Sequence, residues 1–259
     1  MKLPFFQIDA FEEGPFSGNP AAVCVLTTPL EEAVMQAVAA ENNLSETAFI
    51  SPREHDWLIR WFTPACEVDL CGHATLASGA VVLERMDTSA RVVQFHSPRS
   101  GPLAVHRRDG RLELDFPVWP AEPMPVGPLT AALRAAPSAA FSGHYWMAVF
   151  AAEADVAGLA PDMARIAELP VEGVIATAPG RGTDFVSRFF GPRVGVPEDP
   201  VTGSAHAMLA PYWATRLGRP SLQARQISAR GGRLWCEARG ERVGIAGRAR
   251  FVIEGEFTL

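Results

Sequence analysis

Short runs of hydrophobic residues, many alternating with polar ones, recur along the chain in the pattern of β-strands. Alternation over residues 7–11 and an apolar run over 21–26 predict two strands that flank a loop at 12–20. Further strands are predicted at residues 45–50, 58–62, 91–95, 103–107 and 112–116, and then at 145–151, 173–178, 184–190, 223–229, 233–238, 242–246 and 248–255.

Helical spacing of hydrophobic residues is found in fewer places. Residues 30–42 predict a helix that ends near Asn42 and Asn43, and a short helix is predicted at 161–169. The stretch from Gly72 to about Arg85 is apolar on nearly every face, which is typical of a helix inside a protein. We therefore expect strongly curved sheets, each wrapped around a central helix.

One strand–turn–helix pattern occurs twice. The first copy is RWFTP at 60–64 followed by CGHA at 71–74, and the second is RFFGP at 188–192 followed by TGSA at 202–205. The glycine follows the arginine by 12 residues in the first copy and by 15 in the second, and an apolar helical stretch follows each glycine. A period of about half the chain indicates a duplicated domain.

The two glycines, Gly72 and Gly203, are candidate substrate-binding residues. The first N–H groups of a helix have no partner within it, and the helix dipole favours a negative charge there. A glycine allows a ligand to approach this backbone closely. Two such turns, brought together by pseudo-symmetry, would hold an anion such as a carboxylate. The alternative is that each glycine only permits a tight turn.

A proline-rich segment at residues 115–137 is the best candidate for a linker between the two halves. Prolines at this density exclude strands and long helices, although residues 129–135 could form a short helix. The prolines are Pro117, Pro120, Pro123, Pro125, Pro128 and Pro137.

Composition narrows the class of protein. The chain has 259 residues, 48% of them hydrophobic, and a net charge of −6 without a Lys/Arg cluster, which argues against nucleic acid as a partner. No apolar run is long enough to span a membrane, and no signal-peptide pattern is present. Four scattered cysteines do not form a disulfide framework. We expect a cytoplasmic protein with no membrane partner.

Three residues are candidates for proton transfer. Glu46 stands at the head of an apolar strand, where a carboxylate is partly buried and suited to act as a base; the alternative is a solvated residue at a loop edge. Asp199 precedes the second helix and His73 follows Gly72. Asp199 could merely favour the helix dipole, and His73 could be a proton donor, a substrate contact or a residue bonded to backbone.

Cofactor chemistry is not expected. Cys66, Cys71 and His73 do not have the spacing of a standard zinc site, so we predict no metal. The chain also lacks a Walker loop, a Gly-x-Gly-x-x-Gly motif after a strand, and a Gly-x-Ser-x-Gly motif.

Four blocks in order resemble the PhzF family of phenazine-biosynthesis-like isomerases. They are DAF at 9–11 with FSGNPAAV at 16–23, NLSETAF at 43–49, RWFTP at 60–64 with EVDLCGHAT at 67–75, and EDPVTGSA at 198–205. The resemblance covers most of the chain, while the segment from Arg230 onward is less similar.

This resemblance implies an α+β, diaminopimelate-epimerase-like fold with two pseudo-symmetric halves. Each half would be a curved, mostly antiparallel sheet around a central helix, with the site in the cleft between them. The expected domains are residues 1–116 with 251–259, and 117–250. The resemblance also implies a homodimer, no cofactor, and a small carboxylate-bearing substrate.

Carried over to this chain, the family pattern makes Glu46 the general acid/base. His73, Asp199 and Ser204 would line the cleft and assist proton movement. The residues expected to hold the substrate are Asn19, Gly72 and Gly203.

Three functions remain open from the sequence. The first is an isomerase that moves a proton between carbons of a small carboxylic acid. The second is an amino-acid racemase or epimerase, but the two-thiol form of that reaction is disfavoured because Cys71 is matched by Thr202, a far weaker acid. The third is a non-catalytic small-molecule-binding protein.

Overall fold

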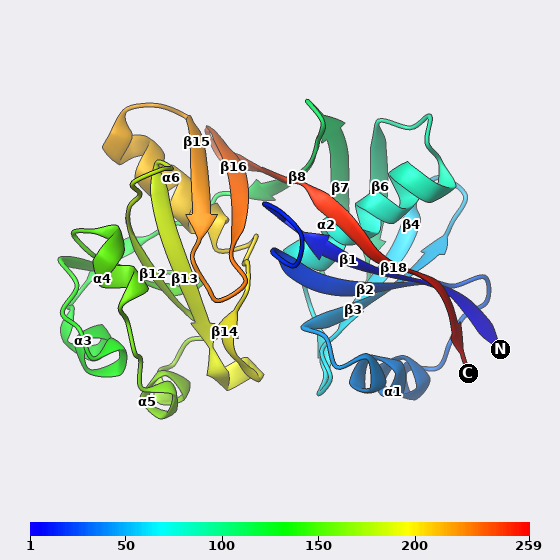
Figure 1. Ribbon diagram of the computed structural model, residues 1–259, viewed down its shortest axis with the longest axis horizontal. Helices are drawn as coiled ribbons and strands as arrows, with labels where there is room; N and C mark the ends of the chain where they lie inside the picture. The colour runs from blue at the N-terminus through cyan, green and yellow to red at the C-terminus, as the bar shows by residue number, and fades with distance from the viewer. The chain divides into compact units, whose positions relative to one another are not determined.

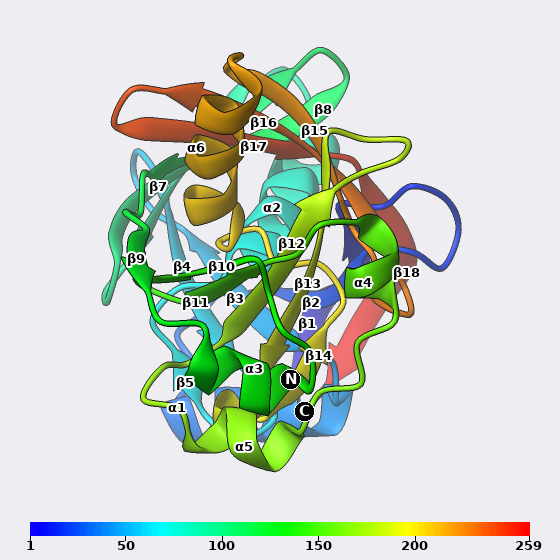
Figure 2. The ribbon, with the colours of Figure 1, turned by 90° about the vertical axis from the view of Figure 1, so that its left-hand side faces the viewer.

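The chain folds into two compact units. The computed structural model describes residues 1–259 (Figures 1 and 2). Unit 1 comprises Met1–Asp115 and Ala246–Leu259, and unit 2 comprises Phe116–Ile245. The return to unit 1 therefore falls at residue 246, whereas the sequence suggested 251. The reason is local: a Cβ on Gly247 would lie 2.3 Å from the ring of Phe11, so this residue is already packed into unit 1.

Unit 1 is a mostly antiparallel sheet. The pairs β1–β18, β1–β2, β3–β4, β6–β7 and β7–β8 are antiparallel, and β2–β3 and β4–β6 are parallel. The strands are β1 (Lys2–Ala10), β2 (Asn19–Val25), β3 (Glu46–Pro52), β4 (Trp57–Phe62), β5 (Glu67–Val68), β6 (Val92–Ser97), β7 (Gly101–Arg108), β8 (Arg111–Pro117) and β18 (Ala249–Thr258).

The sheet of unit 1 curves around one buried helix, as the apolar pattern predicts. All ten residues of α2 (Gly72–Val81) are buried, and the helix contacts β18, β1, β2, β3 and β7 (Figure 1). Strands that lie far apart in one sheet can contact the same helix only if the sheet is curved. The expected helix to Arg85 continues as a π-helical turn (Val82–Met86), while α1 (Glu32–Asn42) packs outside on β3 and β4.

Unit 2 repeats the arrangement with more helices. Its strands are β9 (Glu122–Met124), β10 (Ala139–Ser142), β11 (Trp146–Val149), β12 (Val174–Pro179), β13 (Phe185–Gly191), β14 (Val196–Asp199), β15 (Ser221–Gln226), β16 (Gly232–Arg239) and β17 (Arg242–Gly247). Its helices are α3 (Gly127–Leu133), α4 (Glu153–Ala157), α5 (Met163–Glu168), the 3₁₀ turn Pro192–Val194, and α6 (His206–Leu217). The central helix is α6, which packs on β15 and β16 (Figure 2).

A proline inside α6 ties a neighbouring segment to this helix. Pro211 has no N–H, so the carbonyl oxygen of Ala207 cannot receive the usual helical hydrogen bond. The backbone N–H of Trp119 donates to that oxygen at 3.1 Å. The indole of Trp213 stacks on Phe185 with 5.6 Å between centroids, which anchors α6 in the core of unit 2.

The proline-rich segment is not a free linker. It forms β9, which the sequence did not predict, and α3, whose inner residues are buried in the core of unit 2. Pro123 lies opposite Phe141 in β9, a strand of only three residues, so the missing N–H affects few of the hydrogen bonds to β10. The other elements that the sequence missed are β5, β10, β14, α4 and the 3₁₀ turn Pro192–Val194.

The internal repeat is visible in the packing of its two arginines. Arg60 binds Glu67 through two hydrogen bonds of 2.6 and 2.8 Å, and Arg188 binds Glu198 through two of 2.7 and 2.9 Å. Each guanidinium also lies over the phenylalanine two residues later, at 5.1 Å and 4.9 Å. Each unit thus fixes the strand before its glycine turn in the same way.

None of the helices in either unit has the length and hydrophobicity that a membrane crossing requires.

Candidate active site

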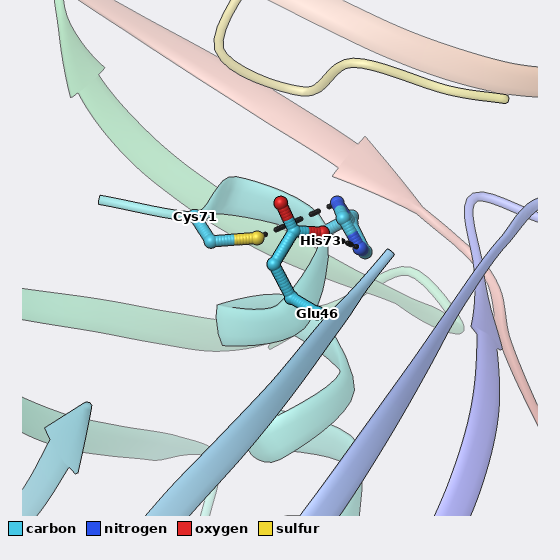
Figure 3. Close-up of side chains that lie close together, drawn as sticks. All are labelled: Glu46, Cys71 and His73. Atoms are coloured by element: carbon cyan, nitrogen blue, oxygen red, sulfur yellow. Dashed lines mark hydrogen bonds and ion pairs between the residues drawn. The ribbon is translucent and has the colours of Figure 1, made fainter. Parts of the chain in front are cut away.

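In unit 1, Glu46 and His73 face each other at the centre of a buried polar group. Oε2 of Glu46 lies 3.0 Å from Nε2 of His73, and their side chains are 14% and 5% exposed. Figure 3 shows Glu46 reaching from its strand toward the first turn of α2. A carboxylate this close to an imidazole can share a proton with it.

Local structure brings Glu46 to this place. The helix α1 ends at Asn42, and the left-handed backbone of its C-cap Asn43 (φ 48°) turns the chain toward β3. The side chain of Asn42 donates to the hydroxyl of Thr47 at 3.0 Å, which fixes the turn. Parallel pairing of β3 with β2 then sets Glu46 opposite Ala21.

Two further side chains contact the other ring nitrogen of His73. Nδ2 of Asn19 lies 3.1 Å from Nδ1, and Sγ of Cys71 lies 3.5 Å from the same atom. Asn19 begins β2, and Cys71 precedes α2 as its N-cap. Gly72 is the first residue of α2 and is buried. Unit 1 therefore gathers Asn19, Glu46, Gly72 and His73, four of the predicted residues.

The charges of this group favour an ion pair. Burial raises the pKa of the Cys71 thiol to about 11, so Cys71 is neutral at pH 7. Burial by itself lowers the pKa of His73, but Cys71 and Glu46 act in the opposite direction, and the pKa is raised well above its usual value. Because the thiol is uncharged at neutral pH, we attribute the increase mainly to the carboxylate of Glu46.

In unit 2, the predicted residue Asp199 is part of a closed hydrogen-bond network. Its Oδ2 accepts from the hydroxyl of Thr202 at 2.5 Å. Gln226, which is fully buried, accepts the N–H of Thr202 at 2.9 Å and donates to the carbonyl of Asp199 at 2.7 Å. Asp199 itself is 8% exposed. The network fixes the segment from Asp199 to Thr202.

The second glycine turn differs from the first in its backbone. The helix α6 begins at His206, three residues after Gly203, where the sequence predicted the start. Residues 203–206 form a tighter turn, in which the N–H of His206 donates to the carbonyl oxygen of Gly203 at 3.0 Å. The hydroxyl of Ser204 lies 3.1 Å from that of Tyr145. In unit 2, the predicted residues Asp199, Gly203 and Ser204 therefore share one short segment, in which Asp199 bonds to Thr202 and Ser204 contacts Tyr145.

Residues 8–255 match the family described as phenazine biosynthesis-like proteins (PhzC-PhzF). The chain belongs to this family. Two proteins of Pseudomonas aeruginosa, both described as uncharacterized isomerases, are 51% identical to it over 100% of both chains. These relatives of the PhzF-family protein confirm the expected reaction class, which is isomerisation.

Solved structures confirm the fold. A PhzF-family structure from Enterococcus faecalis covers 100% of both chains with a TM-score of 0.96 and 46% identity. A hydroxyproline epimerase from Agrobacterium vitis shares the fold at 13% identity, with a TM-score of 0.65 over 99% of this chain and 91% of its own. The α+β, epimerase-like fold expected from the sequence is thus confirmed.

The PhzF-family site contains one set of residues able to hold a metal. One ligand atom each from Glu46, Cys71 and His73 lie within 4.8 Å of one another, and three protein ligands are typical of catalytic zinc. In the present arrangement, however, Glu46 contacts Nε2 of the ring and Cys71 contacts Nδ1. A single ion binds only one ring nitrogen, so these side chains suit a hydrogen-bonded line better than a metal centre. The absence of a metal stays a prediction.

Sequence reasoning missed two residues of unit 2. Gln226 is the inward-facing residue at the end of β15, where exposed and buried residues alternate. A glutamine among the inward positions of an alternating strand is a usable signal, because a buried amide needs partners. Tyr145 was predicted only as part of a strand, and no sequence pattern indicates its contact with Ser204.

Proposed function

We propose that this PhzF-family protein is a cofactor-independent isomerase that moves a proton on a small carboxylate-bearing metabolite. Glu46 acts as the general acid/base. The single observation that supports this most is the buried contact of 3.0 Å between Glu46 and His73. An ionised carboxylate can remove a proton from a carbon next to an activating group, and a protonated imidazole beside it can supply one.

The environment of this pair suits transfer of a proton between carbons. At pH 7 the raised pKa of His73 favours an imidazolium beside the Glu46 carboxylate. Glu46 removes the substrate proton, and the imidazolium of His73 stabilises the carboxylate before the transfer. The C–H bond of the substrate breaks, its electrons move into the adjoining unsaturated system, and the proton is returned at another carbon.

The remaining residues are proposed to bind and support. The first N–H groups of α2, beginning at Gly72, favour the substrate carboxylate through the helix dipole. The side-chain amide of Asn19 contacts Nδ1 of His73, and its oxygen accepts from the imidazolium when the amide is turned over. We assign Gly203 to substrate binding, and Asp199 and Ser204 to assistance of proton movement, with Asp199 in a supporting role.

A racemase or epimerase is the second candidate, because the same fold hosts epimerases and Cys71 adjoins His73. The pKa of Cys71, raised to about 11, disfavours a thiolate base in this position. Epimerisation at the carbon next to the carboxylate, with Glu46 as the base, therefore remains the form of this candidate that agrees best with the site.

Deuterium exchange tests the proposal. Small carboxylates, including but-3-enoate, its larger homologues and L-amino acids, are incubated with the protein in D₂O and followed by proton NMR and chiral chromatography. Loss of a C–H signal with a shifted double bond indicates isomerisation, and exchange with inversion indicates epimerisation. Glu46→Gln should reduce exchange by at least about 100-fold. The matched control is Glu41→Gln, which changes an exposed glutamate on α1.

Two outcomes would contradict the proposal. Near-parental exchange by Glu46→Gln would place the base elsewhere, with Asp199 or His73 next in line. Saturable binding of a panel carboxylate without any exchange would favour a binding protein.

A further inference from the structure

The two glycine turns are held by residues at equivalent positions that differ in chemistry. In unit 1, the hydroxyl of Thr75 donates to the carbonyl oxygen of Cys71 at 2.6 Å. In unit 2, Nδ1 of His206 lies 2.9 Å from the carbonyl oxygen of Thr202. Each donor follows the residue it holds by four positions, and both donors are buried. Since a carbonyl oxygen only accepts, Nδ1 of His206 must carry a proton.

The difference follows from where each helix begins. In unit 1, the backbone N–H of Thr75 also bonds to the carbonyl of Cys71, at 3.1 Å, as in a regular α-helix. In unit 2, the backbone N–H of His206 bonds to Gly203 instead, because the turn before α6 is of the tighter 3₁₀ type. The carbonyl of Thr202 thus lacks the helical donor that its counterpart has. The imidazole of His206 takes the place of that donor.

We propose that His206 is a positioning residue for the second glycine turn. With this contact, all three polar groups of Thr202 are held: the N–H by Gln226, the hydroxyl by Asp199 and the carbonyl by His206. Fixing Thr202 in this way fixes the direction of the backbone that follows, and so places Gly203 and Ser204.

The surroundings of the ring keep it in the required state. His206 is fully buried, and its ring lies 5.8 Å from that of Phe185 at an interplanar angle of 35°. Burial lowers the pKa of His206 to about 4, so the ring is neutral at pH 7. A neutral imidazole has one N–H, and the geometry assigns it to Nδ1.

The first test needs no substitution. In protein labelled with ¹⁵N at histidine, the imidazole shifts at pH 7 distinguish a protonated Nδ1 from a protonated Nε2. We expect the Nδ1–H form for His206. The Nε2–H form would overturn the proposal, because Nδ1 could not then donate to Thr202.

The second test compares His206→Ala with His206→Thr. The threonine variant reproduces the residue that unit 1 uses at this position and can donate to the carbonyl four residues earlier. Amide hydrogen exchange is measured at Thr202, at the residue in position 206 and at Ala207, because the protection of these N–H groups depends on the structure of the turn. Thr75 in unit 1 is the internal control. The alanine variant should exchange at least about tenfold faster at these sites, equivalent to 1.4 kcal/mol, and the threonine variant should recover most of the protection.

Equal protection in the alanine variant and the parent protein, or a threonine variant no better protected than alanine, would refute the positioning role. If the alanine variant fails to fold, the imidazole shifts and the threonine variant decide the question. These readouts involve no substrate.

The consequence for turnover rests on the proposed function. For any panel carboxylate that the parent protein exchanges, His206→Ala should lower kcat by about 10- to 100-fold through misplacement of the turn, and His206→Thr should restore most of it. If the proposed function is wrong, Glu46→Gln will not change turnover. The amide protection of the second glycine turn will be the same in either case. An alanine variant with parental kcat and lost protection would limit His206 to a structural role.

Discussion

His73 lies 3.0 Å from Glu46 through Nε2 and 3.5 Å from Cys71 through Nδ1, so one imidazole separates a carboxylate from a thiol. A carboxylate can accept a proton, whereas burial raises the pKa of the Cys71 thiol to about 11. The two neighbours of the ring should therefore differ sharply in their effect on charge and turnover.

The charge of His73 should depend on Glu46. Replacement by glutamine removes a negative neighbour that raises the pKa of His73, so Glu46→Gln should lower this pKa, measured by NMR titration of the ring. A raised folded pKa gives a stabilisation that is complete below the unfolded value of about 6.5 and is lost as pH rises through the folded pKa. The loss of stability over that range should be smaller in Glu46→Gln, and an unchanged titration would show that the carboxylate does not set the charge.

Cys71 should contribute little to the reaction. Cys71→Ala or Cys71→Ser should reduce turnover by no more than about tenfold, or about 1.4 kcal/mol of barrier. The reason is that Thr202 stands at the matched position of unit 2 and cannot form a thiol pair, while the thiol of Cys71 is protonated. A loss of turnover by several orders of magnitude in a folded variant would support the hypothesis of a thiol-dependent racemase instead.

The protein should not need a metal. Treatment with EDTA should leave the fold and the exchange activity unchanged. Glu46 and Cys71 contact different nitrogens of His73, and one metal ion binds only one of them. Circular dichroism and the deuterium assay measure the two properties, and elemental analysis of the untreated protein provides the control. Tightly bound zinc at one ion per chain, lost together with activity, would show that these three residues rearrange into a metal site.

Gln226 should be important for stability because it satisfies backbone groups of the buried residues Asp199 and Thr202. Gln226→Leu would leave the N–H of Thr202 and the carbonyl of Asp199 without this partner, at about 1–3 kcal/mol for an unsatisfied buried group. Urea unfolding should show a loss of at least about 2 kcal/mol. Gln223→Leu, at an exposed position of the same strand, is the matched control and should change stability far less. Similar values for the two variants would mean that the network adjusts.

Acid should destabilise the folded protein through His206. Its pKa of about 4 in the folded state lies below the unfolded value of about 6.5, so the unfolded chain binds the proton first as pH falls. The contribution of His206 should be constant above about pH 6.5, and protonation of the unfolded chain at this residue should lower stability by about 3 kcal/mol by pH 4. The nearest acidic group of the turn is Asp199, bonded to Thr202, so the comparison is made in His206→Thr and in Asp199→Asn. The first substitution should flatten the decrease; the same slope in both variants and in the parent would assign it to other groups.

Much of the molecule could be predicted from the sequence because its signals are local. The apolar stretch after Gly72 required burial whatever surrounded it, and the structure buries every residue of α2. The repeated arginine and glycine implied a duplication, and the paired contacts of Arg60 and Arg188 show it. Glu46 was placed at the head of a strand, and β3 begins there.

The tertiary structure decided everything that depends on which distant residues meet. The spacing of hydrophobic residues along the chain does not show that Glu46 contacts His73. That contact arises from the pairing of β2 with β3 and from the packing of α2 against both strands. Gln226 reaches Asp199 across 27 positions for the same reason. The later start of α6 also depended on context, since hydrogen bonds from buried side chains offset the helical bond that the turn gives up. Sequence alone determined most of the elements and the types of reactive group; the fold determined their partners, because the energy of a buried polar group depends on what lies next to it.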